Sequence, residues 1–511
     1  MRSVLVRNVL ANVVGRSLSI LTWLALTPWV LRALGPDRFG FWSLLSTLAT
    51  TALLLDLGLG SAVTKYVAEY GEDDVSRARD GAFTAGVLLA SGLALLWGVA
   101  GFAGRGLLLD FAHVQGDWQP EAWMAAGIVP FAAAAGLLAL VPSAALAGLH
   151  RIDLVNRIAL LGTLVQAAAS IWVLRTGGGL PGLMWALLSG SVISLVVATV
   201  VLHRIAPQLR FDLGAASGGR VLEQLRFSAA LQIISLGVLC QFQLPKFALA
   251  RWSSLASVGE FDLGYRVAFA AWSLPSLILP PLLPALSQLT AQGRWDAAWA
   301  LYERAGRYLL IVALPIASIV AATATALYVV WLGPGHTAAT LSLVAIASLL
   351  GINVLTSAGC LFARAIGRPW MEARYHLLSL GLHVALLVWW VPRFGLAGGL
   401  GAMLVSGTVG TIQYLWVFHH QLARSGRHFI TRIAGPPAVV ALVGAGVAWA
   451  VCTAVAGPGA GLDRGRAAIA LVSGGAAGAL VVLVGSFAAR VVSRAELLEI
   501  VQHLRQPRGA V

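Results

Sequence analysis

Near the start of the chain, polar residues recur at steps of three or four within a stretch that is otherwise apolar. The set comprises Asn8, Asn12, Arg16, Ser19, Trp23 and Thr27. This spacing places all six on one face of a helix. Such a face is too polar to point at lipid, so it either lines a hydrated cleft or hydrogen-bonds to neighbouring helices.

A second polar stripe follows more than 200 residues later. It comprises Ser228, Gln232, Ser235, Gln243 and Lys246, and Leu239 interrupts it. Two such stripes in one chain favour the cleft over isolated contacts between helices. We therefore expect Asn12, Arg16, Gln232 and Gln243 to face water or a hydrated substrate.

Four charged residues within apolar stretches are candidates for substrate binding: Arg16, Asp56, Lys246 and Arg266. Arg16 and Asp56 lie about 10 Å deep from the same side, so they can pair, and Asp56 suits a structural pair as well as a proton or substrate site. A guanidinium fits phosphate oxygens, which favours a cavity role for Arg16 over snorkelling to the headgroups. For Lys246, snorkelling to the headgroups is as good an interpretation as substrate binding, and Arg266 can pair with Asp262 four residues earlier.

Motifs for catalysis or metal binding are missing from the sequence. It contains no phosphate loop and no HExxH, and Cys240, Cys360 and Cys452 lack the spacing of a zinc site. His419 and His420 are adjacent but form no larger ligand cluster. We expect no catalytic residue, no metal and no cofactor, and hence no enzyme.

The composition indicates that these residues sit in a membrane. Of 511 residues, 59% are hydrophobic and 11% charged, whereas soluble domains carry about 25% charged residues. Apolar runs long enough to span a bilayer cover residues 9–34, 41–63, 82–104, 123–149, 158–174, 182–203, 227–250, 262–286, 308–331, 338–362, 373–391, 395–418, 435–456 and 467–489. Fourteen transmembrane helices are predicted, with no room for a soluble catalytic domain or a large loop.

The distribution of basic residues orients these helices. With both termini cytoplasmic, 24 of the 35 Lys and Arg residues lie in cytoplasmic tails and loops or at the adjoining span ends, and 8 lie likewise on the opposite side. The remaining three, Arg16, Lys246 and Arg266, lie deeper within spans. The positive-inside rule then places the N- and C-termini in the cytoplasm. The net charge of +14 is therefore no sign of nucleic-acid binding.

The sequence also repeats at an offset of 216 to 217 residues. The segment GLPGLMWALLSGSV at 179–192 returns as GLAGGLGAMLVSGTV at 395–409, and RIDLVNR at 151–157 returns as RPWMEAR at 368–374. Each repeat holds six spans, an even number that keeps both copies in one orientation. We predict an all-α integral membrane protein: two six-helix repeats related by a parallel pseudo-twofold axis, plus two C-terminal helices. The domains are 1–210, 211–426 and 427–511.

Three local features lead to further expectations. The prolines of PPLLP at 280–284 should bend the eighth span. Trp295, Trp299 and Tyr302 should anchor an interfacial helix at the headgroups. Small residues such as SGGAAGAL from Ser473 should pack the last two spans together, and an amphipathic cytoplasmic helix should follow over 493–504.

Three segments resemble the polysaccharide transporter family, the O-antigen and oligosaccharide-lipid flippases of the multidrug/oligosaccharidyl-lipid/polysaccharide exporter superfamily. They are LGPDRFGFWSLLSTL at 34–48, LLLDLGLGSAVTKYVAEY at 53–70 and VGEFDLGYRVA at 258–268. The resemblance implies a cavity between two lobes that turns a polyprenyl-pyrophosphate-linked glycan across the bacterial cytoplasmic membrane, with cavity Arg and Lys residues meeting the pyrophosphate. Many relatives carry an acid just before the span-7 lysine, where this chain has Pro245.

A flippase for cell-surface polysaccharide biosynthesis, including O-antigen and lipopolysaccharide, is therefore the leading interpretation. It implies lipid-linked oligosaccharide and membrane lipids as partners, polysaccharide-assembly proteins as further partners, no nucleic acid, and a monomer in the inner membrane. A multidrug or cation antiporter of the same fold is the alternative, although only Asp56 counts as a buried acid in a span. An integral-membrane glycan polymerase or ligase is a weaker alternative, because it would need a large periplasmic loop and the sequence has no room for one.

The charge asymmetry predicts a labelling pattern. Cysteines placed near Gly116 and Gly461 should react with an impermeant thiol reagent in intact cells. Cysteines near Ser217 and at the C-terminus should react only after permeabilisation. External labelling of the C-terminus in intact cells would overturn the orientation.

Overall fold

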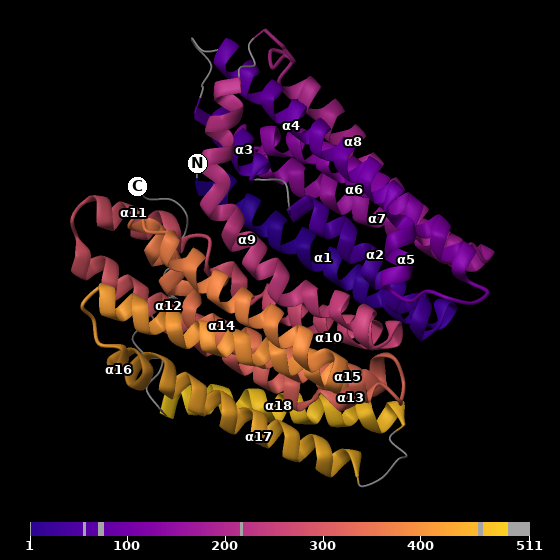
Figure 1. Cartoon of the computed structure of the whole chain (residues 1–511). Coiled ribbons are helices and arrows are strands. Elements are labelled where there is room, and N and C mark those ends of the chain that lie inside the picture. Colours follow the sequence, from indigo (N-terminus) through magenta and orange to yellow (C-terminus); the bar gives the residue numbers. More distant parts are fainter. Residues whose placement is uncertain (1, 55–57, 70–75, 215–217, 458–462, 489–511) are drawn as a thin grey trace. The chain divides into compact units, whose positions relative to one another are not determined.

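The computed structural model describes residues 2–54, 58–69, 76–214, 218–457 and 463–488. All regular secondary structure in these ranges is helical, as the apolar runs predict. The chain divides into two compact units (Figure 1). Unit 1 holds residues 1–262 and 380–399, and unit 2 holds residues 263–379 and 400–511.

The first ten helices begin in unit 1. They are α1 (Arg2–Leu34), α2 (Pro36–Leu54), α3 (Leu59–Glu69), α4 (Ser76–Ala103), α5 (Arg105–Phe111), α6 (Gln119–Gly148), α7 (Ile152–Thr176), α8 (Gly179–Ile205), α9 (Gly218–Trp252) and α10 (Leu255–Ser273). The last of these, α10, continues beyond residue 262 into unit 2.

The remaining elements belong wholly or partly to unit 2. They are the 3₁₀ helix η1 (Pro275–Ile278), α11 (Leu282–Ala291), α12 (Trp295–Ala322), α13 (Ala324–Trp331), α14 (Thr337–Ala365), α15 (Trp370–Gln421), α16 (Gly426–His428), the π-helix η2 (Phe429–Ala434), α17 (Gly435–Ala456) and α18 (Arg464–Ala488). The middle of α15, residues 380–399, lies in unit 1.

Twelve segments among the described residues are long and apolar enough to cross a membrane. Their helical structure confirms the all-α membrane class. Two of the fourteen predicted spans have no separate counterpart. The predicted span 41–63 includes residues 55–57, which lie outside the described part of the chain, and the spans 373–391 and 395–418 are joined in α15 across the non-helical backbone of Gly395 (φ 51°, ψ −128°).

Unit 1 is built around α6. This helix packs along α4 and α8, and Figure 1 shows the three lying side by side. Its sequence is rich in alanine and glycine, and small side chains let neighbouring helices approach closely without polar contacts. The helix α7 in turn packs against α8 and α1, so α7 connects the polar first helix to the rest of unit 1.

The helix α12 corrects one sequence prediction. Trp295, Trp299 and Tyr302 do not form a separate interfacial helix, because α12 runs without a break from Trp295 to Ala322. Tyr302 is 1% exposed and its ring lies 5.8 Å from that of Phe362, centroid to centroid. These aromatic rings therefore belong mostly to the core of unit 2 rather than to a headgroup anchor.

Two other local predictions are confirmed. The predicted eighth span is interrupted as its prolines require: α10 ends at Ser273, a 3₁₀ turn follows, and α11 begins at Leu282. The last two spans, α17 and α18, pack through glycines, and a Cβ atom at Gly474 would lie 2.7 Å from the carbonyl oxygen of Ala448. The predicted helix over 493–504 lies outside the described residues.

Two segments that carry the family resemblance meet at the start of α2 and α10. A Cβ atom at Gly40 would lie 1.7 Å from the carbonyl oxygen of Leu255, and one at Gly259 would lie 2.9 Å from the ring of Phe39. Asp37 accepts a hydrogen bond from the backbone N–H of Ala256 at 3.1 Å, in the first turn of α10. Glycine at these two positions therefore lets the backbones touch, and a carboxylate satisfies the helix end.

This close approach predicts that Gly40→Ala destabilises the protein. The added methyl group must displace the backbone of α10, at a cost of about 1–3 kcal/mol or more in the free energy of unfolding. Gly92→Ala is the matched control, because Gly92 lies in α4 with open space around its Cβ position. Thermal unfolding of detergent-purified protein should show a lower Tm for Gly40→Ala only. Equal Tm values for the two variants would contradict the contact.

Candidate functional site

A buried polar cluster joins α2, α9 and α10 within unit 1. The Lys246 ammonium lies 2.6 Å from Oδ1 of Asp262 and donates a second hydrogen bond to Oγ1 of Thr47 at 3.0 Å. Thr47 in turn donates to Oε1 of Gln243 at 3.5 Å. All four side chains are at most 9% exposed. The cluster is therefore an ion pair surrounded by protein and held by polar neighbours.

The position of Lys246 contradicts one of its two interpretations, that it snorkels to the headgroups. Its side chain is 3% exposed, and its partner Asp262 lies sixteen residues later on α10. Transfer of an unpaired charge into the membrane interior costs about 2.5–3.5 kcal/mol on insertion scales, so a buried lysine needs a partner. Asp262 supplies this charge.

The ion pair also accounts for the departure at Pro245. In this chain the acid near Lys246 comes from α10 and not from the preceding residue of α9. Pro245 lacks an N–H to donate within the helix, so it weakens the helical ladder one residue before the lysine.

The other predicted site residues are placed as follows. Gln243 is buried and bonded to Thr47. Contrary to the expectation, it does not face water in this structure. Asn12, Arg16 and Gln232 fall on the helices α1 and α9, but their side chains lie outside the described residues, as does Asp56. Arg266 is half-buried in unit 2, on the second part of α10. The structure thus brings together Gln243 and Lys246, and the binding roles of all seven residues stay predictions.

Sequence reasoning missed Thr47 and Asp262 as members of the cluster. Asp262 was assigned to Arg266 because the two are four residues apart on one helix. Thr47 belongs to a run of serines and threonines in LLSTLATT. Serine and threonine hydroxyls commonly bond a carbonyl group of their own helix, so the sequence does not single out Thr47 as a partner of another helix. The depth of Lys246 within an apolar run was the one available signal that a partner had to exist.

Buried carboxylates are more numerous than the sequence indicated. The sequence indicates only Asp56 as a buried acid in a span, whereas Asp80, Asp153, Asp262 and Glu372 are each at most 8% exposed. Asp80, Asp153 and Glu372 lie in the first two turns of a helix, and Asp262 lies at the end of a predicted span. Hydropathy alone cannot tell burial from exposure at such positions. The count of a single buried acid, which spoke against an antiporter, is therefore too low for the described residues.

One of these acids belongs to a second charged cluster, in unit 2. Glu372, near the start of α15, accepts two hydrogen bonds of 2.7 Å from the Nε and Nη2 atoms of Arg364, near the end of α14. Nε2 of His376 lies 3.9 Å from the same carboxylate. This two-pronged geometry is the strong form of an arginine–carboxylate pair and fixes the connection between the two helices.

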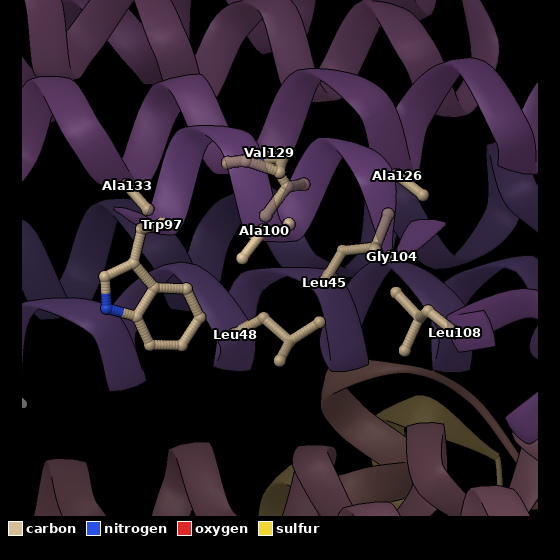
Figure 2. Close-up of a pocket in the computed structure, with 11 residues that line it drawn as sticks. Leu45, Leu48, Trp97, Ala100, Gly104, Leu108, Ala126, Val129 and Ala133 are labelled. Carbon is tan, nitrogen blue, oxygen red and sulfur yellow. The ribbon is translucent and has the colours of Figure 1, made fainter. Parts of the chain in front are cut away.

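Unit 1 also holds an apolar cavity of about 190 Å³ between α2, α4, α5 and α6. Figure 2 shows Trp97, Leu45, Leu48 and Val129 around it, together with several alanines. Its lining offers no charged side chain, so this cavity suits hydrocarbon and not an anionic headgroup. Among the described residues, no group of three or more His, Cys, Asp or Glu side chains could hold a metal ion.

The fold resembles solved membrane transporters. The lipid II flippase MurJ, in an inward closed conformation, covers 95% of this chain and 99% of its own length, with a TM-score of 0.68 and 11% identity. An inward-facing multidrug resistance MATE transporter of the MOP superfamily covers 81% and 94%, with a TM-score of 0.63 and 13% identity. A MOP superfamily transporter from Pyrococcus furiosus covers 82% and 95%, with a TM-score of 0.61 and 16% identity.

These similarities define the class: a multi-pass integral membrane protein whose fold is like that of MurJ and the MATE transporters. Residues 5–290 match the model of the polysaccharide biosynthesis protein family. The chain belongs to this family. No curated protein matches the sequence.

The Lys246 cluster predicts a particular pattern of stability. Lys246→Met leaves the Asp262 carboxylate buried without its partner and should lower the free energy of unfolding by about 3–5 kcal/mol. Asp262→Asn should have a similar effect. The double variant should be more stable than the sum of the two losses implies, because no unpaired charge remains. Thermal unfolding in detergent measures all three variants. Additive losses would show that the two groups are not coupled.

Proposed function

We propose that the protein is a flippase that moves polyprenyl-pyrophosphate-linked oligosaccharide across the bacterial cytoplasmic membrane by alternating access. The main support is the combination of membership in the polysaccharide biosynthesis family with a fold that the lipid II flippase matches over 95% of the chain. The MATE transporters cover 81–82% of it. A substrate that joins a lipid, a pyrophosphate and a glycan fits both observations. We place O-antigen and lipopolysaccharide assembly among the pathways it could serve.

The proposal includes fourteen membrane spans, as six, six and two. Twelve candidate spans come from the described residues. Dividing α15 at Gly395, where its backbone is non-helical, adds one, and α2 with α3 makes the other across residues 55–57. With an even number of spans, both termini lie on one side, which the basic residues predict to be the cytoplasm.

Pyrophosphate recognition is assigned first to Arg16. Lys246 is neutralised by Asp262 in this structure, so a phosphate would have to compete with a carboxylate 2.6 Å away. Arg16 instead stands in the polar stripe of α1, and a guanidinium binds phosphate oxygens with two parallel hydrogen bonds. Apart from the buried Gln243, the remaining predicted residues, namely Asn12, Asp56, Gln232 and Arg266, are proposed to contact the glycan or water around it.

A cation or multidrug antiporter is the second candidate. The buried acids in both units favour it more than the sequence suggested, since carboxylates are the groups that exchange protons or bind cations. In this interpretation Asp262 would bind the coupling ion after Lys246 moved away. Export of a lipid-linked glycan and drug resistance can be measured in the same strain, which separates the two functions. For either function we propose a monomer that also meets membrane lipids and polysaccharide-assembly proteins, and that binds no nucleic acid.

The flippase proposal predicts that Arg16→Ala abolishes surface glycan export. Arg16→Lys should restore only part of the activity, because an ammonium is a point charge and cannot replace the two-pronged guanidinium. Complementation of a deletion strain, scored by surface polysaccharide on gels, measures the effect.

Membrane insertion and protein level should match the unmodified protein in both variants, and Arg2→Ala serves as a control from the same helix outside the stripe. Full complementation by Arg16→Ala would make Arg16 a headgroup anchor and remove it from the proposed mechanism. Loss of drug resistance without loss of glycan export in Asp262→Asn would instead support the antiporter.

A further inference from the structure

A groove of about 490 Å³ lies in unit 2 where α15 ends and the chain turns through α16 and η2 into α17. Three of its lining side chains are large, apolar and exposed: Ile412, Trp416 and Ile430. The exposed basic residues His420, Arg424 and Arg427 line the other part. The groove therefore changes from apolar to basic along its length.

The geometry points to a binding site for an anionic glycerophospholipid, and we propose this class of ligand for the groove. Its acyl chains would lie along the apolar part and its phosphodiester would meet the guanidinium groups. A soluble phosphate would use only the basic part and leave the apolar residues exposed to water. Basic pockets at the ends of transmembrane helices are a recurrent way to bind anionic lipid headgroups.

The aromatic residues place this groove at the level of the headgroups. The Trp416 ring is stacked on the ring of His420, with centroids 5.5 Å apart and planes inclined by 3°. Trp416 is 68% exposed, although it lies only five residues before the end of α15. Tryptophan is enriched at membrane interfaces because its ring is apolar and its N–H is polar.

The charges around the groove leave a positive surplus for a phosphate. Nη2 of Arg424 lies 3.1 Å from Oδ1 of Asp296, whose side chain is 98% exposed. Such an exposed pair is worth little, so Arg424 can exchange this partner for a lipid phosphate. Arg427 is exposed on the same wall and adds a second guanidinium.

A buried histidine in the groove wall supplies a second, independent sign of a ligand. His419 is 3% exposed and its Nδ1 bonds the carbonyl oxygen of Leu415 at 2.8 Å. Its Nε2 atom has no hydrogen-bond partner among the described residues. A buried ring nitrogen in this state calls for an explanation. A glycerol hydroxyl of the lipid headgroup can donate to it.

The test uses the full chain in nanodiscs of phosphatidylcholine that contain a minor fraction of dibrominated lipid. Bromine quenches tryptophan on contact, and the signal of Trp416 is obtained by subtracting the emission of Trp416→Phe. Brominated phosphatidylglycerol should quench Trp416 at a several-fold lower fraction than brominated phosphatidylcholine. Arg427→Gln should weaken this preference about fivefold, which is about 1 kcal/mol, the contribution of one basic side chain near anionic lipid.

Arg424→Gln combined with Arg427→Gln should abolish the preference. Arg432→Gln should keep it, since Arg432 is exposed nearby on η2 but does not line the groove. Because Arg427 is exposed, its single variant keeps the test valid if the double variant fails to fold. Equal quenching by both lipids, or a preference that survives loss of Arg427, would overturn the proposal. Displacement of the phosphatidylglycerol signal by inorganic pyrophosphate would assign the groove to a soluble anion instead and would also overturn it.

Discussion

Charged and polar groups inside a membrane protein must find their partners within the protein, and this constraint governs the Lys246 cluster. Neither Lys246 nor Asp262 could remain charged at 3% exposure without the other. Thr47 accepts a hydrogen bond from Lys246 and donates one to Gln243. The helices α2, α9 and α10 are therefore held in one packing arrangement, because α2 contributes Thr47, α9 contributes Lys246 and α10 contributes Asp262 to the same cluster.

The ion pair depends in turn on how closely α2 approaches α10. Gly40 and Gly259 remove the side chains that would otherwise separate the two backbones. Thr47 lies two turns beyond Gly40, and Asp262 lies three residues beyond Gly259. A wider spacing of the helices would take both oxygens away from the Lys246 ammonium. The glycines of the family segments thus act on the charged cluster through helix packing.

The sequence predicted the helices well and their partners poorly. Hydropathy located the spans because the bilayer imposes a length and an apolar composition on each helix separately. The pairing of Lys246 with Asp262 depends on which faces of α9 and α10 meet, and no local pattern encodes that. The prediction that Trp299 and Tyr302 anchor a helix at the headgroups was wrong for the same reason, because an aromatic face suits a headgroup anchor and a helix interface equally well. Small-residue packing of α17 and α18 was predictable because an apolar helix without bulky side chains has few other ways to associate.

The neutral state of the Lys246 cluster bears on how the protein could hold an anionic substrate. An open lysine in an empty site would attract any cytosolic phosphate, whereas a lysine paired with Asp262 binds only a ligand that outcompetes a carboxylate at 2.6 Å. A doubly charged pyrophosphate can do so if another cation shares its charge. The first contact then falls to a residue without a buried acid beside it. Under the flippase proposal, Arg16 in α1 would recognise the pyrophosphate before anything changes at Lys246. The Lys246–Asp262 pair would then separate only after the substrate has bound.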